Sequence, residues 1–422
     1  MTTQPLDLDE AAELDEIDPL TKLRDEFEIP KRSDGSDQSY FAGNSLGLLP
    51  KRTRLAIQEA VDQWGSKGVT GHFDGEEAWY QLDESIADLQ KNIVGCHTSE
   101  TGIMGSLTTN LHMLMASFYR PEGKKRKILI EPHAFPSDRY AVAAQVEWHG
   151  GDPRNDVVTI EAENPDSITP EDLDRTLQDQ GNTICLALLG GVNYYTGQFL
   201  DIATFAPLLK AKEITIGLDL AHAVGNVPLE LHEWGVDFAS WCTYKYLNAG
   251  PGSIAGYFVH KQHHENQDLI RLAGWWGNDP STRFDMHGQS DFIPRPSADS
   301  WKTSCPSLLA MVPLKASLDM FAEYGMDRLR ERSIRLTNYF EKGINAITNI
   351  SSITPKEHER RGCQISVRVS GSASTLEQKL VNQGIVPDAR DPDILRFAPV
   401  PMYSTFSDIA IGIEGLSQLL QN

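Results

Sequence analysis

The chain has 422 residues, and its 38 basic and 59 acidic side chains give a formal net charge of −21 at pH 7. An acidic surplus of this size repels phosphates, so it argues against nucleic acid or an anionic membrane surface as the main partner. Because 40% of the residues are hydrophobic, the chain can build a core, which excludes global disorder. Its apolar stretches are far too short to span a membrane. The composition favours an acidic, soluble enzyme of about three domains.

The cysteines and the N-terminal residues bear on the location of the protein. The five cysteines are widely spaced and form no CxxC pair, which indicates a reducing compartment and no thiolate metal site. Residues 1–28 contain ten acidic and two basic side chains, without the features of a secretory signal or a transit peptide. We therefore expect a cytoplasmic protein. Residues 1 to about 37 are weakly patterned, which predicts a mobile or surface-draped lead-in.

Apolar periodicity predicts the elements in chain order. Helical segments come first, at 55–65, 79–94 and 106–119. Buried strands are predicted at 128–131, 183–189, 214–220, 236–244 and 253–259. Helical stretches lie between them, around 138–147, 170–179 and 201–212. Such alternation predicts an α/β fold whose mostly parallel central sheet has helices on both faces.

The pattern changes near residue 305. A long helical region extends to about 348 with a break at Gly325, and a strand, a helix and a strand follow at 363–369, 374–383 and 394–400. This predicts a smaller α+β unit at the C-terminal end. We expect an N-terminal arm that packs on the small domain, then a large domain and the small domain itself, with the ranges 1–50, 51–305 and 306–422.

Four groups of polar or aromatic residues stand where predicted strands end or helices begin. Asp219, with His222 close behind it, ends a buried strand, and strand ends in an α/β sheet face a ligand crevice. Lys245 lies between two tyrosines before a Gly-rich turn, where it could form a Schiff base with a carbonyl cofactor. The other groups are Leu107-Thr108 at a helix start, which suits an anion, and Phe135-Pro136-Ser137-Asp138 after a strand.

Each group taken alone has a plainer explanation. Asp219 could cap a turn, Lys245 could be a surface lysine, and Phe135 could be a core residue. Their order along the chain is more specific, because it supplies what a pyridine cofactor needs. Hydroxyl groups meet its phosphate, an aromatic ring stacks on it, an acid meets its ring nitrogen and a lysine holds its aldehyde.

Longer stretches extend this pattern from about Leu23 to Asp408. They include YFAGNSLGLLPKRT, SLTTNLHMLMASFY, EPHAFPSDRYA, VNYYTGQ, GWWGNDPSTRFDM, LRFAPVPMY and the long DLAHAVGNVPLELHEWGVDFASWCTYKYLNAGPG. With these stretches the chain resembles the kynureninase family, pyridoxal-phosphate enzymes of the aspartate-aminotransferase fold type. The resemblance implies a large domain that binds pyridoxal 5'-phosphate, a small C-terminal domain, a homodimer with a shared active site, and no metal.

The resemblance also implies the reaction. It would be hydrolytic Cβ–Cγ cleavage of L-kynurenine or 3-hydroxy-L-kynurenine to anthranilate or 3-hydroxyanthranilate plus L-alanine, in tryptophan catabolism and NAD biosynthesis. The partner would be a small amino-acid substrate.

Individual residues match family positions. Lys245 resembles the lysine that binds the cofactor covalently, Asp219 the partner of its ring nitrogen, and Tyr244 a phosphate-binding tyrosine that also transfers protons. Arg396 resembles the arginine that takes the substrate α-carboxylate, and Trp275 a cofactor contact supplied across the dimer interface. The remaining cofactor positions implied are Leu107, Thr108, Phe135, Pro136, Ser137, Asp138, His222 and Cys305, with His72 and Ser304 in the substrate pocket.

Two positions depart from the family pattern. The chain has Ser304-Cys305-Pro306 where Ser-Asn-Pro is usual, and Cys is a poor hydrogen-bond donor. Gly190 stands where a hydroxyl residue or Pro is common. These departures leave open the choice between the two substrates, and also a paralogue that acts on a modified kynurenine.

Three other functions compete with this interpretation. A cysteine desulfurase-like lyase or a class V aminotransferase would keep the fold, but a desulfurase needs a mobile nucleophilic cysteine. A nicotinamide-dependent dehydrogenase lacks its GxGxxG motif here. A non-catalytic scaffold that recruits partners through its acidic N-terminus would bind no cofactor.

Overall fold

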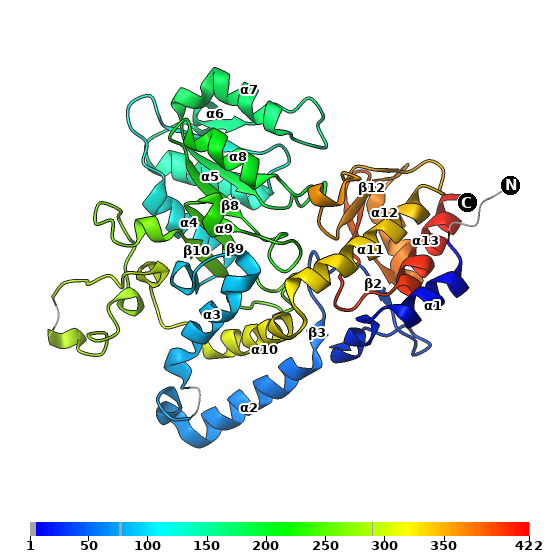
Figure 1. Ribbon diagram of the computed structural model, residues 1–422, viewed down its shortest axis with the longest axis horizontal. Coiled ribbons are helices and arrows are strands. Elements are labelled where there is room, and N and C mark those ends of the chain that lie inside the picture. The colour runs from blue at the N-terminus through cyan, green and yellow to red at the C-terminus, as the bar shows by residue number, and fades with distance from the viewer. Residues whose placement is uncertain (1–5, 76–77, 289, 422) are drawn as a thin grey trace.

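The computed structural model of the chain describes residues 6–75, 78–288 and 290–421, and forms two units side by side (Figure 1). The larger unit is built on a seven-stranded sheet in the order β4-β10-β9-β8-β7-β5-β6. Its strands are β4 (Thr101–Ile103), β5 (Lys127–Ile130), β6 (Val157–Thr159), β7 (Ile184–Gly190), β8 (Thr215–Asp219), β9 (Phe238–Trp241) and β10 (Gly256–Val259).

The strands from β9 to β6 run parallel, and β10 pairs antiparallel with both of its neighbours. This confirms the predicted mostly parallel sheet. All five predicted strands of the large domain exist, with ends shifted by a few residues. The two short edge strands, β4 and β6, were not predicted.

Alternate residues of the strands pack into two separate cores. In β5, Leu129 joins one core while Ile128 and Ile130 join the other, because successive side chains of a strand point to opposite faces. Helices α4 (Leu107–Phe118) and α5 (Pro136–Trp148) supply Leu114 and Val142 to the second core. The first core is covered by α3 (Leu82–Val94), α7 (Pro170–Gln180), α8 (Ile202–Lys210) and α10 (Leu308–Tyr324). The sheet is therefore covered on both faces, as the continuous apolar runs predicted.

Short helices connect these elements, and α2 (Lys51–Lys67) lies along α10 at the lower margin of Figure 1. The remaining helices of the large unit are α6 (Pro153–Asp156) and α9 (Leu231–Trp234). No helix within the described ranges has the length and apolar character needed to cross a membrane.

The smaller unit holds an antiparallel sheet in the order β11-β12-β15-β14. Its strands are β11 (Ser351–Ser352), β12 (Ile365–Arg368), β14 (Asp388–Arg390) and β15 (Ile394–Phe397). Its helices are α11 (Met326–Ile344), α12 (Ala373–Asn382) and α13 (Phe406–Gln421), which share a third core. The parallel pair β2 (Ser39–Tyr40) and β13 (Ile385–Val386) joins the N-terminal segment to this unit, and β1 (Phe27–Glu28) pairs with β3 (Leu49–Pro50). The predicted domain limits at residues 50 and 305 stay a prediction.

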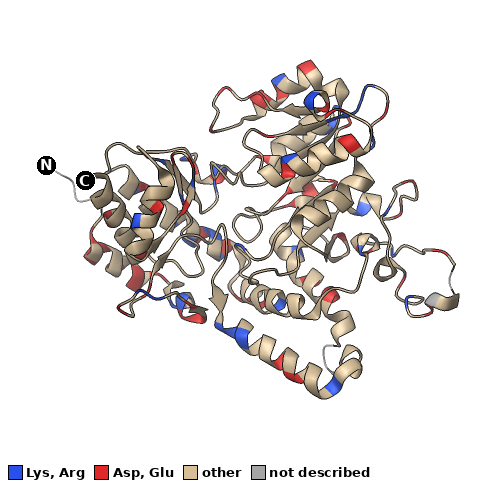
Figure 2. Cartoon of the chain, turned by 180° about the vertical axis from the view of Figure 1, so that it is seen from behind, with Lys and Arg blue, Asp and Glu red and all other residues tan. Residues whose placement is uncertain are grey.

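The N-terminal segment contains a helix that the sequence did not predict, α1 (Leu8–Ile17), which lies beside α13 (Figure 1). Its only buried residue is Ala11, so its apolar pattern is too sparse to be recognised. Its acidic residues meet partners on the small unit: Glu10 pairs with Lys342 at 2.9 Å, and Asp15 accepts the Phe406 N–H at 2.8 Å. Elsewhere, acidic and basic residues are interspersed over both units (Figure 2).

Candidate active site

The carboxyl ends of β5, β7 and β8 and the N-termini of α4 and α5 surround a cavity of about 240 Å³. This is the edge at which open α/β sheets bind ligands. The lining residues are Ser106, Leu107, Thr108, Glu131, Phe135, Asp138, Gly190, Val192, Tyr194, Asp219, Ala221, His222, Tyr244 and Lys245. The cavity thus brings together eight of the predicted site residues.

Lys245 and His222 form the central pair of the cavity. The Lys245 Nζ lies 2.9 Å from the His222 Nε2. His222 is buried, and burial together with the Lys245 charge holds its pKa well below the ordinary value. His222 is therefore neutral at pH 7, and its Nε2 can accept a hydrogen bond from the lysine. The opposite ring nitrogen, Nδ1, is buried without a partner.

Two buried carboxyl groups face each other at the end of β8. Asp219 is the last residue of the strand and accepts the Ala221 N–H at 2.8 Å. Asp138, in the first turn of α5, lines the same cavity as Asp219, and two like charges this close in a buried site repel each other. Burial and the Asp219 charge accordingly raise the pKa of Asp138 well above its ordinary value. Such a pair of acids can stabilise the protonated form of a basic nitrogen placed beside it.

Two helix N-termini point at the cavity. Thr108 in the first turn of α4 and Ser137 in the first turn of α5 join through their hydroxyl groups at 2.9 Å. Ser106, the residue that precedes α4, makes no side-chain cap to this helix. The free N–H groups and hydroxyls of such a site suit a phosphate.

The aromatic wall is made by Phe135 and Tyr194. The Lys245 Nζ lies 6.0 Å from the Phe135 ring centre, and Tyr194 meets this ring edge to face at 5.1 Å. Phe135 is 41% exposed, so its face is open to a second flat ring. Pro136 directly after it is the first residue of α5, where its fixed φ favours the helix.

Arg396 lies behind Tyr194 in β15 and is buried. Its Nε and Nη2 donate to Asp388 Oδ1 at 3.0 and 2.6 Å, and its Nη1 donates to the Tyr194 carbonyl at 2.7 Å. A guanidinium has five N–H donors, so one donor on each terminal nitrogen remains.

Tyr244 is half-buried beside Lys245. Burial is the main cause that raises the pKa of its hydroxyl, and the neighbouring Cys242 adds to it. The hydroxyl therefore stays protonated at neutral pH and can donate a hydrogen bond.

The other predicted residues lie outside this cavity. The His72 ring packs on Trp79 at 5.4 Å, and the 37%-exposed Trp275 packs on Trp276 at 4.8 Å. Phe284 contacts Trp275 at 6.2 Å and Phe73, next to His72, at 5.8 Å, so the two predicted residues share one aromatic cluster. Ser304 and Cys305 are exposed before α10.

Sequence reasoning missed Ser106, Glu131, Val192 and Tyr194 among the lining residues. Glu131 follows β5 directly, and Tyr194 follows β7, so their position after buried strands was the available signal. Tyr194 was visible in the VNYYTGQ stretch without a role attached.

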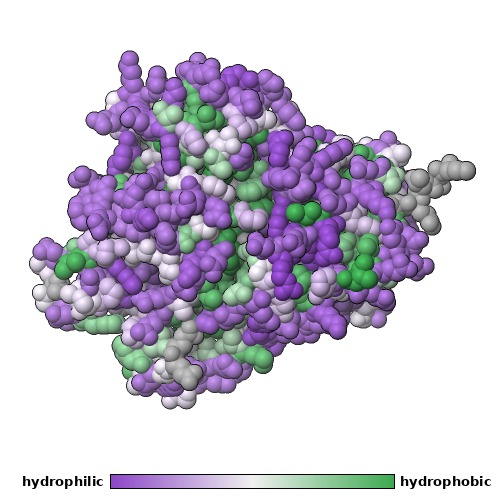
Figure 3. Space-filling view, viewed as in Figure 1, coloured by the Kyte–Doolittle hydropathy of each residue, from purple (hydrophilic) through white to green (hydrophobic). Residues whose placement is uncertain are grey.

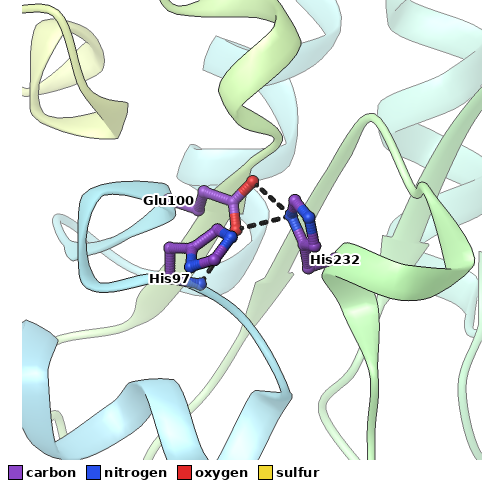
Figure 4. A group of neighbouring side chains, drawn as sticks. All are labelled: His97, Glu100 and His232. Carbon is purple, nitrogen blue, oxygen red and sulfur yellow. Dashed lines mark hydrogen bonds and ion pairs between the residues drawn. The ribbon is translucent and has the colours of Figure 1, made fainter.

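A second cluster of titratable side chains, His97, Glu100 and His232, lies at the opposite edge of the sheet, before β4 and β9 (Figure 4). These residue types bind metals, but each Glu100 oxygen already accepts two hydrogen bonds, from the His232 ring and from the N–H groups of His97 and Lys261. Burial opposes the charge, yet these bonds hold the pKa of Glu100 below its ordinary value. We interpret the cluster as a link between loops.

The residues of the cavity fit pyridoxal phosphate. Lys245 supplies the amine, Asp219 the acid for a ring nitrogen, Phe135 an open aromatic face, and the N-termini of α4 and α5 a phosphate site. The His222 Nδ1 and the Asp138 Oδ1 are buried without partners, as expected where a polar ligand belongs. Fold and site together define a pyridoxal-phosphate-dependent enzyme of fold type I.

Comparisons narrow this class. The kynureninase of Xanthomonas axonopodis pv. citri is 45% identical over 418 residues, covering 98% of each chain, and that of Xanthomonas oryzae pv. oryzae is 46% identical over 402 residues, covering 94% of each. The family described as "Kynureninase C-terminal domain" matches residues 329–416. The chain belongs to the kynureninase family, whose members are pyridoxal-phosphate-dependent hydrolases.

Solved structures agree on the fold. The cysteine desulfurase CsdA from Escherichia coli superposes with a TM-score of 0.76 at 16% identity, covering 95% of this chain and 98% of that one. The cystine C-S lyase C-DES gives a TM-score of 0.73 at 17% identity, covering 92% and 97%. Likeness at this low identity supports the architecture alone.

Proposed function

We propose that this cavity hydrolyses the Cβ–Cγ bond of L-kynurenine or 3-hydroxy-L-kynurenine, releasing L-alanine and anthranilate or 3-hydroxyanthranilate, as the kynureninase family does. The observation that supports it best is the Lys245–His222 pair at 2.9 Å, in one cavity with Asp219 and Phe135. Bound at Lys245, pyridoxal phosphate supplies an electron sink that stabilises negative charge on the substrate carbons.

Lys245 has two tasks in this proposal. Its Nζ would hold the cofactor, and the same Nζ, when free, would take the substrate α-proton. His222 is neutral and adjacent, so it adds no positive charge to the lysine and can orient the Nζ through its Nε2. Asp219 and Asp138 would favour a proton on a pyridine nitrogen, and the open face of Phe135, followed by Pro136, would contact a flat ring.

Tyr244 and the helix N-termini complete the cofactor site. Thr108, Ser137 and the N–H groups that begin at Leu107 would hold the phosphate. The Tyr244 hydroxyl is protonated, so it can donate to the phosphate or give a proton to the γ-carbonyl oxygen while water adds to that carbon.

Arg396 is suited to the substrate α-carboxylate. Asp388 and the Tyr194 carbonyl use three of its five donors, which leaves one N–H on each terminal nitrogen. Two parallel donors match the two oxygens of a carboxylate. Holding that group fixes the direction of the bond to be broken.

A homodimer explains the residues outside the cavity. We assign His72, Ser304, Cys305 and Trp275 to an active site shared between two copies. A dimer is supported by exposed apolar side chains of α2 and the segment after it: Leu55, Val61, Trp64, Val69 and Phe73 are 41–74% exposed. In Figure 3, hydrophobic patches lie among hydrophilic surface along the lower margin of the molecule. Large apolar side chains exposed in this number are typical of a segment that another molecule covers.

Location and substrate choice are further parts of the proposal. Five free cysteines and a small-molecule substrate support the cytoplasm. A desulfurase-like activity remains the alternative, because Cys305 is exposed. However, although the residue as a whole is exposed, desolvation by the protein atoms around its thiol and the Asp83 charge raise the pKa of that thiol, which weakens it as a nucleophile.

The test compares wild-type protein with Lys245→Ala and with Lys124→Ala, an exposed lysine outside the cavity. L-Kynurenine, 3-hydroxy-L-kynurenine and L-cysteine are supplied in turn, and L-alanine release and the visible absorbance of the lysine-bound cofactor are measured. We expect alanine from a kynurenine, and loss of both signals in Lys245→Ala alone. Alanine from cysteine but not from kynurenine would refute the proposal.

A further inference from the structure

Glu131 is a buried acid in the cavity to which the proposed reaction gives no task. It directly follows β5, is only 4% exposed, and lines the same cavity as Asp219 and Lys245. Burying a carboxyl group is costly unless its partners or its ligand repay it. Its contacts therefore indicate what it does.

Two donors fix the Glu131 carboxyl group in place. The Gly190 N–H donates to Oε2 and the Asn193 Nδ2 donates to Oε1, each at 2.8 Å. The Asn193 amide cannot turn round, because its Oδ1 accepts the N–H groups of Tyr195 and Thr196, both at 3.0 Å. The carboxyl oxygens thus have one orientation, with both donors supplied by the end of β7 and its turn.

Gly190 gives this carboxyl group its space. In the sheet, Gly190 is the register partner of Asp219. A Cβ at position 190 would lie 2.8 Å from Glu131 Oε1, closer than carbon and oxygen can approach. Since Gly190 has no side chain, Glu131 reaches across the end of β7 towards the end of β8. Three neighbouring strand ends therefore carry an acid, a glycine and an acid.

The charges in the cavity are unbalanced. Among the described lining residues, Glu131, Asp138 and Asp219 are acids, and Lys245 is the only base besides the neutral His222. Burial and the Asp219 charge raise the pKa of Glu131 to about 7, although Gly190, Asn193 and Arg139 act against the rise. A positive nitrogen held at Asp219 would relieve this repulsion, because it attracts both charges.

We propose that Glu131 is a positioning residue for the cofactor, whose fixed carboxylate reinforces Asp219 so that the pyridine nitrogen stays protonated. Gly190 is the position that makes room for it. This inference rests on the proposed function, because it assigns a task around pyridoxal phosphate. It predicts that the charge of Glu131, and not only its size, sets cofactor affinity and the proton affinity of the lysine-bound cofactor.

The experiment uses full-length protein from which pyridoxal phosphate is removed and then titrated back. The variants are Glu131→Gln, which keeps the size, removes the charge and replaces one of the two accepting oxygens with an NH2 group, and Glu147→Gln as control, an exposed glutamate on α5. The measurements are the Kd for pyridoxal phosphate and the pH midpoint of the cofactor's visible absorbance. In Glu131→Gln we expect the Kd to rise about tenfold and the midpoint to fall by about one pH unit. Glu147→Gln should match the wild type.

Gly190→Ala provides a second, independent variant, because a methyl group there displaces the Glu131 carboxyl without removing it. It should lower the same midpoint, and should have no added effect in a protein that already carries Glu131→Gln. If both single variants keep the wild-type Kd and midpoint, Glu131 is only a structural link and the inference is wrong, even if melting temperatures fall. A wild-type protein that takes up no pyridoxal phosphate would overturn the proposed function as well.

Discussion

Arg396 illustrates how a side chain is prepared for a ligand at the scale of single residues. Its link to Asp388 holds the guanidinium from one side, and two N–H donors are left for a carboxylate. Arg396→Lys removes the two-pronged geometry but keeps the charge, so we expect KM for L-kynurenine to rise about a hundredfold. The Kd for pyridoxal phosphate should stay unchanged, since no Arg396 atom lines the cofactor cavity. Steady-state kinetics check the first expectation and cofactor titration the second; equal losses in both would contradict the assigned role.

Glu131 makes the stability of the cofactor-free protein depend on pH. Its pKa rises from 4.5 to about 7 on folding, chiefly through burial and the Asp219 charge, so the folded state binds more protons between these values. The raised pKa means that stability falls as the pH rises from about 4.5 to about 7. Relative to Glu131→Gln, wild-type protein should lose roughly 3 kcal/mol over this window, on the scale of 1.4 kcal/mol per unit. Urea unfolding at several pH values measures this loss of stability. Parallel plots of unfolding free energy against pH for the two proteins would refute the prediction.

At the scale of elements, the N-termini of α4 and α5 together form the proposed phosphate site. The hydroxyls of Thr108 and Ser137 bring the first turns of α4 and α5 together at 2.9 Å, so two sets of free N–H groups face one point. Thr108→Val keeps the shape and removes one hydroxyl, and we expect the Kd for pyridoxal phosphate to rise about tenfold. Thr98→Val, a similar change at the opposite edge of the sheet, is the control. Fluorescence titration of the cofactor-free protein measures both.

The strand ends were predictable as elements, but the contacts between them were not. Asp219 and Lys245 were found because each follows a buried run at the catalytic edge, and the order of residues along the chain carried the chemistry. Glu131 was missed because an acid after a strand is common, and only the three-dimensional approach of Gly190 and Asn193 gives it meaning. Likewise α1 was missed because Ala11 alone is buried, and its stability comes from ion pairs and caps with residues over 300 positions away.

At the scale of the whole molecule, the cavity of a single chain does not include all residues of the predicted site. His72 and Trp275 lie in an aromatic cluster outside the cavity, and α2 exposes apolar side chains, among them Leu55 at 66% and Trp64 at 60%. If a second copy covers the exposed apolar side chains of α2, Leu55→Glu with Trp64→Glu should place charges in the interface and separate the copies. We expect sedimentation velocity to give half the wild-type mass and kynurenine turnover to fall at least tenfold. Trp148→Glu, an equally exposed tryptophan on α5 at 67%, should change neither mass nor turnover. A double variant that keeps the wild-type mass would show that α2 is not the dimer interface.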